Sequence, residues 1–402
     1  MGARVLSARA LAVATLLATG CYRPSARPCQ LSCSNEGTCP DGLFCSAAGS
    51  CVAHPMDTCD VDAPSSNCTF HASTVDPCAI GALDATGTLS LSAITTDLMI
   101  DTGSPAGPFN PPAPAVGMVV TTTDGEVAVL EYRDVDLSGG HSIRVVGARP
   151  LVILANNDMM IDAPIVVSPT TAMVSPCGMG VLGSAPKGGG GGGGYGDRGG
   201  AGGSSGAATD ASAAGGGFAG GVTIQPLRGG CHGSAGGAAV GVGGAGGLGG
   251  GAIQLSAAHM LTLGINGSVQ APGAGGRGVA DTFGGAGGGG TGGSILIEAP
   301  LGTLAGKLCA NGGAGGSTGL SAPPSVDGGC TAMPAQGTTG TYVGGAGGAR
   351  GLPATAGASS TVGSTTGGGG GGGGVGRIRI NGGLTDTAIV VESPLASHEG
   401  VP

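Results

Sequence analysis

A glycine run that leads directly into a short apolar strand recurs along this chain and constrains its fold more than any other feature. In the clearest copy, 285–316, the run meets an apolar stretch at 295–299, and a corner, a second apolar stretch and more glycine follow. Similar copies lie at 249–276 and 375–382, and a copy with fewer glycines lies at 151–168. A single copy cannot bury its own apolar face, so units of this kind gain stability by stacking on one another.

The strand onsets are regularly spaced. Ile253 and Ile295 lie 42 residues apart, and Ile295 and Ile378 lie 83 apart, close to twice that distance. We expect one long unit of about two rungs, with one unit replaced by 317–366. Four small residues also match if the later unit has lost three residues: Gly267 with Gly306, and Ala271 with Ala310.

The composition permits either ordered glycine-rich structure or disorder. The chain has 92 glycines and 25 prolines among 402 residues, a level typical of low-complexity chains or collagen. Collagen is excluded because the glycines come in runs rather than at every third position. Disordered chains are poor in apolar residues and rich in charge, whereas this one is 40% hydrophobic and 10% charged. We therefore expect order, with a disordered glycine coat as the alternative.

Two arrangements can compensate for the backbone entropy that glycine loses on folding. Glycine segments can lie side by side as extended polyproline-II strands with hydrogen bonds between segments, which resembles the glycine-rich domains of certain receptor ectodomains. Alternatively, they can act as flexible flaps between rungs. We expect a mixture in which the longest pure runs, 188–194 and 367–374, are mobile.

Short apolar segments at close intervals predict strands in the region before the glycine runs. A Pro-rich stretch at 104–115 predicts an exposed connection, and no Trp is present to support an immunoglobulin-like sandwich. Strands of three to five residues with asparagine corners favour an all-β fold, a right-handed parallel β-helix with long glycine-rich loops. The predicted strands lie at 87–93, 98–100, 126–130, 143–147, 151–155, 159–161 and 165–167.

The N-terminus has the pattern of an export signal. Arg4 and Arg9 precede an apolar run at 10–18 that is too short to span a bilayer. The following Leu-Ala-Thr-Gly-Cys at 17–21 resembles a bacterial lipobox, which implies that Cys21 carries a diacylglycerol and becomes the first mature residue. An ordinary signal peptide, with this cysteine in a disulfide, is the alternative. By the same resemblance, a mature second residue other than Asp implies sorting to the outer membrane, on its periplasmic or cell-surface face.

The cysteine count agrees with lipidation, since one of 13 cysteines must remain unpaired in an exported chain. Closely spaced cysteines in the region 21–78 predict a small disulfide-rich module, which resembles EGF-like or knot-like modules. Their spacings are wider than those of zinc ligands, so we expect no metal site there. By proximity, Cys177 is expected to pair with Cys231 and Cys309 with Cys330. The disulfide candidates are Cys29, Cys33, Cys39, Cys45, Cys51, Cys59, Cys68, Cys78, Cys177, Cys231, Cys309 and Cys330.

Motifs that resemble catalytic signatures lack the partners their chemistry needs. The Asp-Thr-Gly at 101–103 resembles an aspartic-protease signature, but that mechanism uses two such carboxylates and the chain has one copy. We interpret it as a strand that ends in a turn. Asp134 and Asp136 are expected to be outward-facing strand residues, and His232 and His259 are isolated. A polysaccharide lyase needs clustered carboxylates beside a base, and no such cluster is evident. We therefore expect no catalytic, cofactor-binding or metal-binding residues.

Charge and aromatic content restrict the partners. The net charge is −9 with only two lysines, which gives no electrostatic basis for binding nucleic acid. With no Trp, five Phe and four Tyr, the usual stacking platforms for sugars and bases are scarce. We expect no small-molecule substrate. The expected partners are the membrane, through the lipid, and an envelope or extracellular polymer or protein.

The complete layout resembles the glycine-rich outer-membrane lipoproteins of high-GC Gram-negative bacteria. It predicts a signal peptide at 1–20, the disulfide-rich module at 21–78, the first β-helix rungs at 79–168, the glycine-rich repeats at 169–382 and a C-terminal tail at 383–402. The resemblance implies a location and a fold but no chemistry. Our first hypothesis for the function is a non-enzymatic structural or adhesion protein of the cell envelope. A β-helix that binds or degrades polysaccharide is the alternative, and a disordered glycine coat is the second alternative.

Overall fold

The computed structural model divides the chain into two compact units, Met1–Cys68 and Thr69–Pro402. The described part of the first unit holds β1 (Phe44–Cys45), antiparallel to β2 (Cys51–Val52). The described residues contain no helical segment with the length and apolar character to span a bilayer. The structure describes residues 39, 44–45, 51–52, 70, 72–78, 87–92, 96–103, 116–122, 125–169, 180, 187–206, 213–217, 219, 221–238, 242–279, 284–319, 325–361, 367–386 and 391–399.

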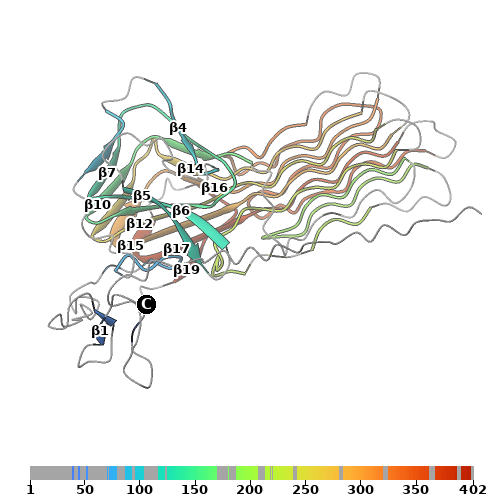
Figure 1. Cartoon of the computed structure of the whole chain (residues 1–402). Helices are drawn as coiled ribbons and strands as arrows, with labels where there is room; N and C mark the ends of the chain where they lie inside the picture. Colours follow the sequence, from blue (N-terminus) through green and yellow to red (C-terminus); the bar gives the residue numbers. More distant parts are fainter. Residues whose placement is uncertain are drawn as a thin grey trace, which may run out of the picture. The chain divides into compact units, whose positions relative to one another are not determined.

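The second unit is all-β, with parallel strands in two curled sheets (Figure 1). Its strands form three parallel β-ladders that the chain visits in turn. The first ladder holds β6 (Gly125–Tyr132), β9 (Leu151–Ala155), β12 (Ala252–Ala257), β15 (Ser294–Leu304), β17 (Arg377–Asp386) and β19 (Ser397–Glu399). The second holds β3 (Thr88–Ser90), β7 (Asp134–Leu137), β10 (Asp158–Ile161), β13 (Met260–Leu263) and the later halves of β15 and β17. The third holds β4 (Leu98–Asp101), β8 (Ile143–Val146), β11 (Pro164–Val167), β14 (Ser268–Gln270), β16 (Lys307–Cys309) and β18 (Val391–Ser393).

Apolar residues in register across the ladders make the core. In the first ladder Ile153, Leu255, Ile297 and Ile380 pair in sequence, and all are at most 2% exposed. Because strands alternate their side chains between two faces, one apolar residue in two is enough to maintain such a row. Each buried side chain of this size contributes about 1.5–3 kcal/mol. The second and third ladders add similar rows to the same cluster.

The register confirms the spacing inferred for the repeats and corrects the size of the unit. Ile253 pairs with Ile295, which pairs with Ile378, and Ser268 pairs with Lys307 after the loss of three residues. One unit contributes one strand to each of the three ladders, which is a single rung, and then a glycine-rich excursion. The expected two rungs per unit are therefore wrong. The excursions leave after β11, β14 and β16, always between the third ladder and the next strand of the first.

Three further strands differ from the sequence expectations. β5 (Val116–Thr122), which was not predicted, pairs antiparallel with β6 and forms the one described hairpin of the second unit. The region expected as a C-terminal tail supplies β18 and β19, which continue the third and first ladders.

The glycine excursions pack side by side as a hydrogen-bonded array, which we call the glycine lattice. The segment 284–293 lies at its centre, and its residues are buried. Figure 1 shows the lattice segments running alongside one another in green, yellow and orange-red. The lattice comprises 187–206, 213–217, 230–238, 242–250, 271–279, 284–293, 310–319, 344–349, 355–358 and 367–376.

The hydrogen bonds of the central segment repeat every three residues. Its N–H groups donate in rotation to three neighbouring segments, and its carbonyl oxygens accept in rotation from three others, so six segments surround it. A polyproline-II strand has three residues per turn and no internal hydrogen bonds, so its polar groups point outward at about 120° intervals. The N–H groups from Gly285 to Gly293 donate, in order, to Gly237, Gly368, Arg277, Ser234, Gly371, Ala274, Cys231, Gly374 and Ala271. The carbonyl oxygens from Gly285 to Thr291 accept, in order, from Gly244, Gly190, Gly316, Gly247, Gly193, Gly313 and Gly250.

The longest glycine runs belong to this lattice. The runs 188–194 and 367–374 are buried along their whole length, and 367–374 also bonds in a period of three to its neighbours. The expectation that these runs are mobile is therefore wrong. The runs lie side by side with hydrogen bonds between segments, in the period of three that a polyproline-II strand has, because each run has partners that lie far away in the sequence.

Glycine is required here by close backbone approach. A Cβ on Gly289 would overlap the carbonyl oxygen of Gly313, and one on Gly372 would overlap that of Ala346. The Cα hydrogens therefore face neighbouring carbonyl oxygens, an arrangement that allows Cα–H···O contacts of about 0.5–1 kcal/mol each.

One predicted disulfide is present: Cys309 and Cys330 are bonded across 21 residues at the base of an excursion. Cys231, Cys39, Cys45 and Cys78 also take part in disulfides. The expected partner of Cys231 lies outside the described residues. The other calls that lie outside them concern Cys21, Cys29, Cys33, Cys59, Cys68, Cys177 and the signal peptide.

Candidate functional site

A row of polar residues on the outer face of the first ladder forms a cluster that is buried except at its last member, Glu399. Ser256, Glu298, Asn381 and Glu399 are paired in register on adjacent strands β12, β15, β17 and β19. Outward polar residues of a strand usually face solvent. Here Ser256 is fully buried and Glu298 is 6% exposed, because chain segments cross over this face.

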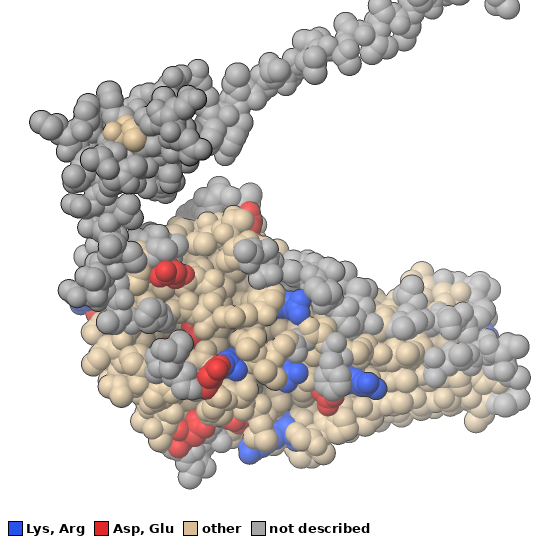
Figure 2. Space-filling model, turned by 90° about the horizontal axis from the view of Figure 1, so that it is seen from below, with Lys and Arg blue, Asp and Glu red and all other residues tan. Residues whose placement is uncertain are grey.

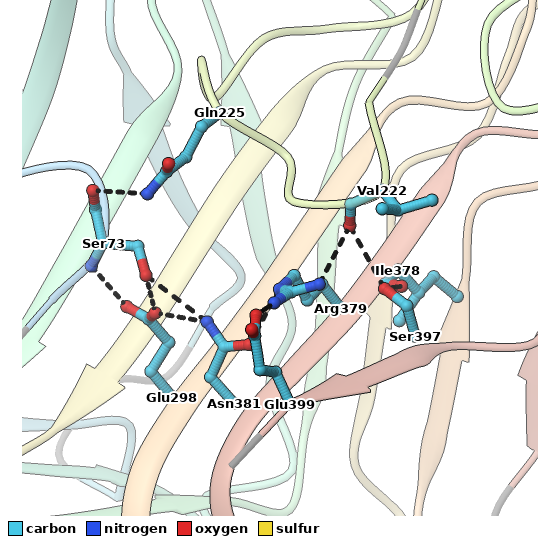
Figure 3. Close-up of polar contacts among 9 residues, drawn as sticks. All are labelled: Ser73, Val222, Gln225, Glu298, Ile378, Arg379, Asn381, Ser397 and Glu399. Atoms are coloured by element: carbon cyan, nitrogen blue, oxygen red, sulfur yellow. Dashed lines mark hydrogen bonds and ion pairs between the residues drawn. The ribbon is translucent and has the colours of Figure 1, made fainter. Parts of the chain in front are cut away.

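Glu298 is the centre of the cluster (Figure 3). Its carboxylate accepts hydrogen bonds from the N–H of Ser73 at 2.9 Å and from the Ser73 hydroxyl. It also accepts from Gln254 Nε2 at 2.7 Å, Ser256 Oγ at 3.0 Å and Asn381 Nδ2 at 2.8 Å. A buried carboxylate is stable only when its oxygens are hydrogen-bonded, and five donors meet that requirement.

Arg379 extends the cluster toward the covering segment 221–228. Its Nε donates to Asn381 Oδ1 at 2.8 Å, one of its NH groups donates to the carbonyl of Val222 at 3.3 Å, and it forms an ion pair with Glu399. Gln225 in the same segment donates to the carbonyl of Ser73 at 3.2 Å (Figure 3). The cluster therefore attaches two distant segments to the sheet, and its carboxylate is occupied by the protein's own donors.

A pocket of about 450 Å³ adjoins this cluster. Ser73, Thr74 and Gln225 line one side of it, and Glu126 and Arg149 contribute charge. Arg149 Nε lies 2.7 Å from Glu126 Oε2, so the two charges of the lining neutralise each other. The pocket can hydrogen-bond a hydroxylated ligand, and its described lining holds one carboxylate, that of Glu126, where glycosidase chemistry uses two.

The residues singled out from the sequence lie apart from this cluster and pocket. Asp101 accepts from the N–H of Gly103 at 2.8 Å, so the Asp-Thr-Gly motif ends a strand in a turn, as predicted. Asp134 and Asp136 lie half-buried on β7 and alternate with core residues, as expected for outward strand positions. His259 is not isolated, because its Nδ1 lies 2.7 Å from Asp158 Oδ1.

Asp134 is held ionised by its surroundings. The Arg133 side chain, which donates to it at 2.7 Å, lowers the pKa of this carboxyl below its usual value, and Asn157 adds a second hydrogen bond. Arg133 is exposed and Asp134 is partly exposed, so this pair contributes little to stability.

Sequence reasoning missed one group of metal-ligating type. Asp386, Glu392 and His398 each offer a ligand atom, and these atoms lie within 4.8 Å of one another. They come from β17, β18 and β19, so no short motif joins them. They could have been found by continuing the strand register of the repeats beyond residue 382, which places these residues beside core residues of the previous strands.

Charged side chains gather on the strand region and are sparse on the glycine lattice. On the face shown in Figure 2, acidic and basic residues lie mainly over the strands, and the lattice presents mostly uncharged surface. Comparison with known proteins finds no family model, no curated protein and no solved structure that matches the chain.

Proposed function

We propose that this chain is a non-enzymatic structural or adhesion protein of the cell envelope, held at the outer membrane by a lipid on Cys21. We further propose that its ladders form a right-handed parallel β-helix. Three parallel ladders visited in a fixed order support the helix, and parallel crossovers are right-handed in about 98% of cases.

The single observation that carries this function is the glycine lattice. The backbone groups of its segments form hydrogen bonds with one another. A side chain at the positions of closest approach would disrupt these hydrogen bonds. Such a body is rigid and presents little charge, which suits a projecting element better than a catalytic one. Folding glycine into a closely packed segment also costs more conformational entropy than folding other residues. We expect a chain to carry this cost only where the shape and stiffness of the segment matter.

The anchor is tested by metabolic labelling with palmitate followed by membrane fractionation. We expect labelled wild-type protein in the outer-membrane fraction, and an unlabelled Cys21→Ser variant that leaves that fraction. An unlabelled wild-type protein would remove the anchor from the proposal.

The role of the lattice is tested separately by a cell–cell aggregation assay in the source bacterium. We expect aggregation to fall in Cys21→Ser cells and also in Gly289→Val cells, where the anchor is intact but the lattice is disrupted. Normal aggregation with normally labelled Gly289→Val protein would show that contact does not depend on the lattice.

A specific observation favours a second candidate, the binding of an exported polysaccharide. The pocket beside Ser73 contains hydroxyl and amide groups, and Thr74 Oγ1 has no hydrogen-bond partner among the described residues. Pull-down with the cell's own extracellular polysaccharide tests it. Thr74→Val removes only the hydroxyl, and reduced retention of this variant would favour the polysaccharide-binding function over the purely structural one.

A further inference from the structure

The inward-facing residues of the three stacked ladders change from apolar to polar at the end formed by β17, β18 and β19. In each of the three ladders, the last described inward-facing residue carries a metal-ligating side chain where the previous strand carries an aliphatic core residue. All three of the aliphatic residues belong to the hydrophobic core. The pairs in register are Leu304 with Asp386, Leu308 with Glu392, and Ile380 with His398.

These three side chains converge at the end of the core. His398 Nε2 lies 3.5 Å from Asp386 Oδ2 and 3.9 Å from Glu392 Oε1. Ligand atoms of a tetrahedral zinc ion, each about 2.0–2.1 Å from the metal, are about 3.3 Å apart. The two separations that involve His398 are close to this value, and the third, between Asp386 and Glu392, is within 4.8 Å.

Glu392 provides the second, independent observation. The residue is 8% exposed, and its Oε1 has no hydrogen-bond partner among the described residues. Its other oxygen accepts from the N–H of Ala396 at 3.1 Å, which fixes the carboxylate in place. A buried carboxylate oxygen without a hydrogen bond costs free energy unless a cation reaches it.

We propose that Asp386, Glu392 and His398 bind one divalent transition-metal ion, Zn²⁺ by preference, which closes this end of the stack. Imidazole favours Zn²⁺ over Ca²⁺ and Mg²⁺, and the two carboxylates supply a charge that balances the ion. Three protein ligands leave a fourth position for water. Asp386 and His398 are partly exposed, so the ion has a path from solvent.

Calorimetric titration of the full mature protein with ZnCl₂ tests the site. The protein is purified in detergent without a polyhistidine tag and dialysed against EDTA and then metal-free buffer. We expect one saturable equivalent per chain and a higher unfolding temperature with Zn²⁺ than without it. CaCl₂ in place of ZnCl₂ should bind at least tenfold more weakly.

Two variants and a matched control distinguish metal binding from a polar cap. Glu392→Gln keeps the shape of the side chain, so we expect it to lower zinc affinity at least tenfold and to leave the metal-free protein as stable as wild type or more so. His398→Ala should lower the affinity by a similar factor. His259→Ala, which removes another histidine paired with an aspartate, should leave zinc binding unchanged.

Three results would overturn the proposal. They are the lack of saturable zinc binding, full binding by both Glu392→Gln and His398→Ala, and tighter binding of Ca²⁺ than of Zn²⁺.

Discussion

The N–H of Gly289 donates to the carbonyl oxygen of Gly371 at 2.8 Å, although these two glycines belong to different excursions of the chain. Hydrogen bonds of this kind hold the lattice together mainly through its backbone. Its stability depends on how closely backbones approach, which leads to predictions that differ from those for an ordinary core.

A methyl group in the lattice should be as damaging as overpacking a core. Gly289→Ala places a Cβ against the carbonyl oxygen of Gly313, so the segments must separate. We expect a loss of about 1–3 kcal/mol in the free energy of unfolding, the usual cost of overpacking. Urea denaturation followed by circular dichroism measures it.

Gly217→Ala is the matched control, since nothing lies within 4 Å of a Cβ built there. The free energy of unfolding should stay within about 0.5 kcal/mol of wild type or rise slightly, because alanine restricts the unfolded chain. Equal losses in both variants would mean that the close approach of the Gly313 carbonyl to Gly289 does not set the cost.

Removing the charge of Glu298 should loosen the segments that it attaches. Glu298→Gln replaces an acceptor oxygen with an amide that faces the donors of Ser73, Gln254 and Asn381. We expect a loss of about 3 kcal/mol, since buried groups are left without hydrogen-bond partners. Hydrogen exchange should rise in 72–78 before it rises in the ladders.

The same substitution at an exposed glutamate is the control. Glu126, whose side chain is 51% exposed, pairs with Arg149 near the surface. Glu126→Gln should cost at most about 1 kcal/mol, as expected for an exposed ion pair. Unaltered exchange at 72–78 in Glu298→Gln would refute the attachment role.

Tyr132 should make the protein sensitive to alkaline pH. Its side chain is fully buried, its hydroxyl has no hydrogen-bond partner among the described residues, and burial raises the pKa of this hydroxyl above its ordinary value of 10.0. The unfolded chain then loses this proton at a lower pH than the folded chain. Stability is therefore complete below about pH 10 and falls as the pH rises further.

Tyr132→Phe should be at least as stable as wild type at pH 7 and should lose less stability between pH 9 and pH 11. Urea midpoints across this range measure both effects. Tyr195→Phe is the contrasting variant, because that hydroxyl lies 2.8 Å from Ser294 Oγ, and its removal should cost about 1 kcal/mol at pH 7. A steeper alkaline loss in Tyr132→Phe would exclude the predicted linkage.

Periodicity was enough to predict many of the strands that carry core residues, although β13, with Leu261 and Leu263, was not among them. The onsets Ile253, Ile295 and Ile378 lie in register because each must place an aliphatic side chain above the previous one. Sequence proximity also predicted the bond between Cys309 and Cys330, since a loop of this length closes readily.

The buried polar cluster could not be predicted in the same way. Glu298 alternates with apolar residues, and this pattern is the same whether the outer face meets water or another segment. Only the positions of 72–78 and 221–228 over the sheet decide the outcome. The ordered packing of the glycine runs was missed for a similar reason. The sequence of one run does not show which segments will pack around it.

Along 284–293, every third residue bonds to the same neighbouring segment, so the number of residues in a run fixes which neighbour each later residue faces. Adding one residue would turn every later donor toward the wrong neighbour, whereas adding three would return each to an equivalent direction. Run lengths should therefore vary in steps of three among related chains. This constraint acts on the number of residues in a run and not on the amino-acid composition.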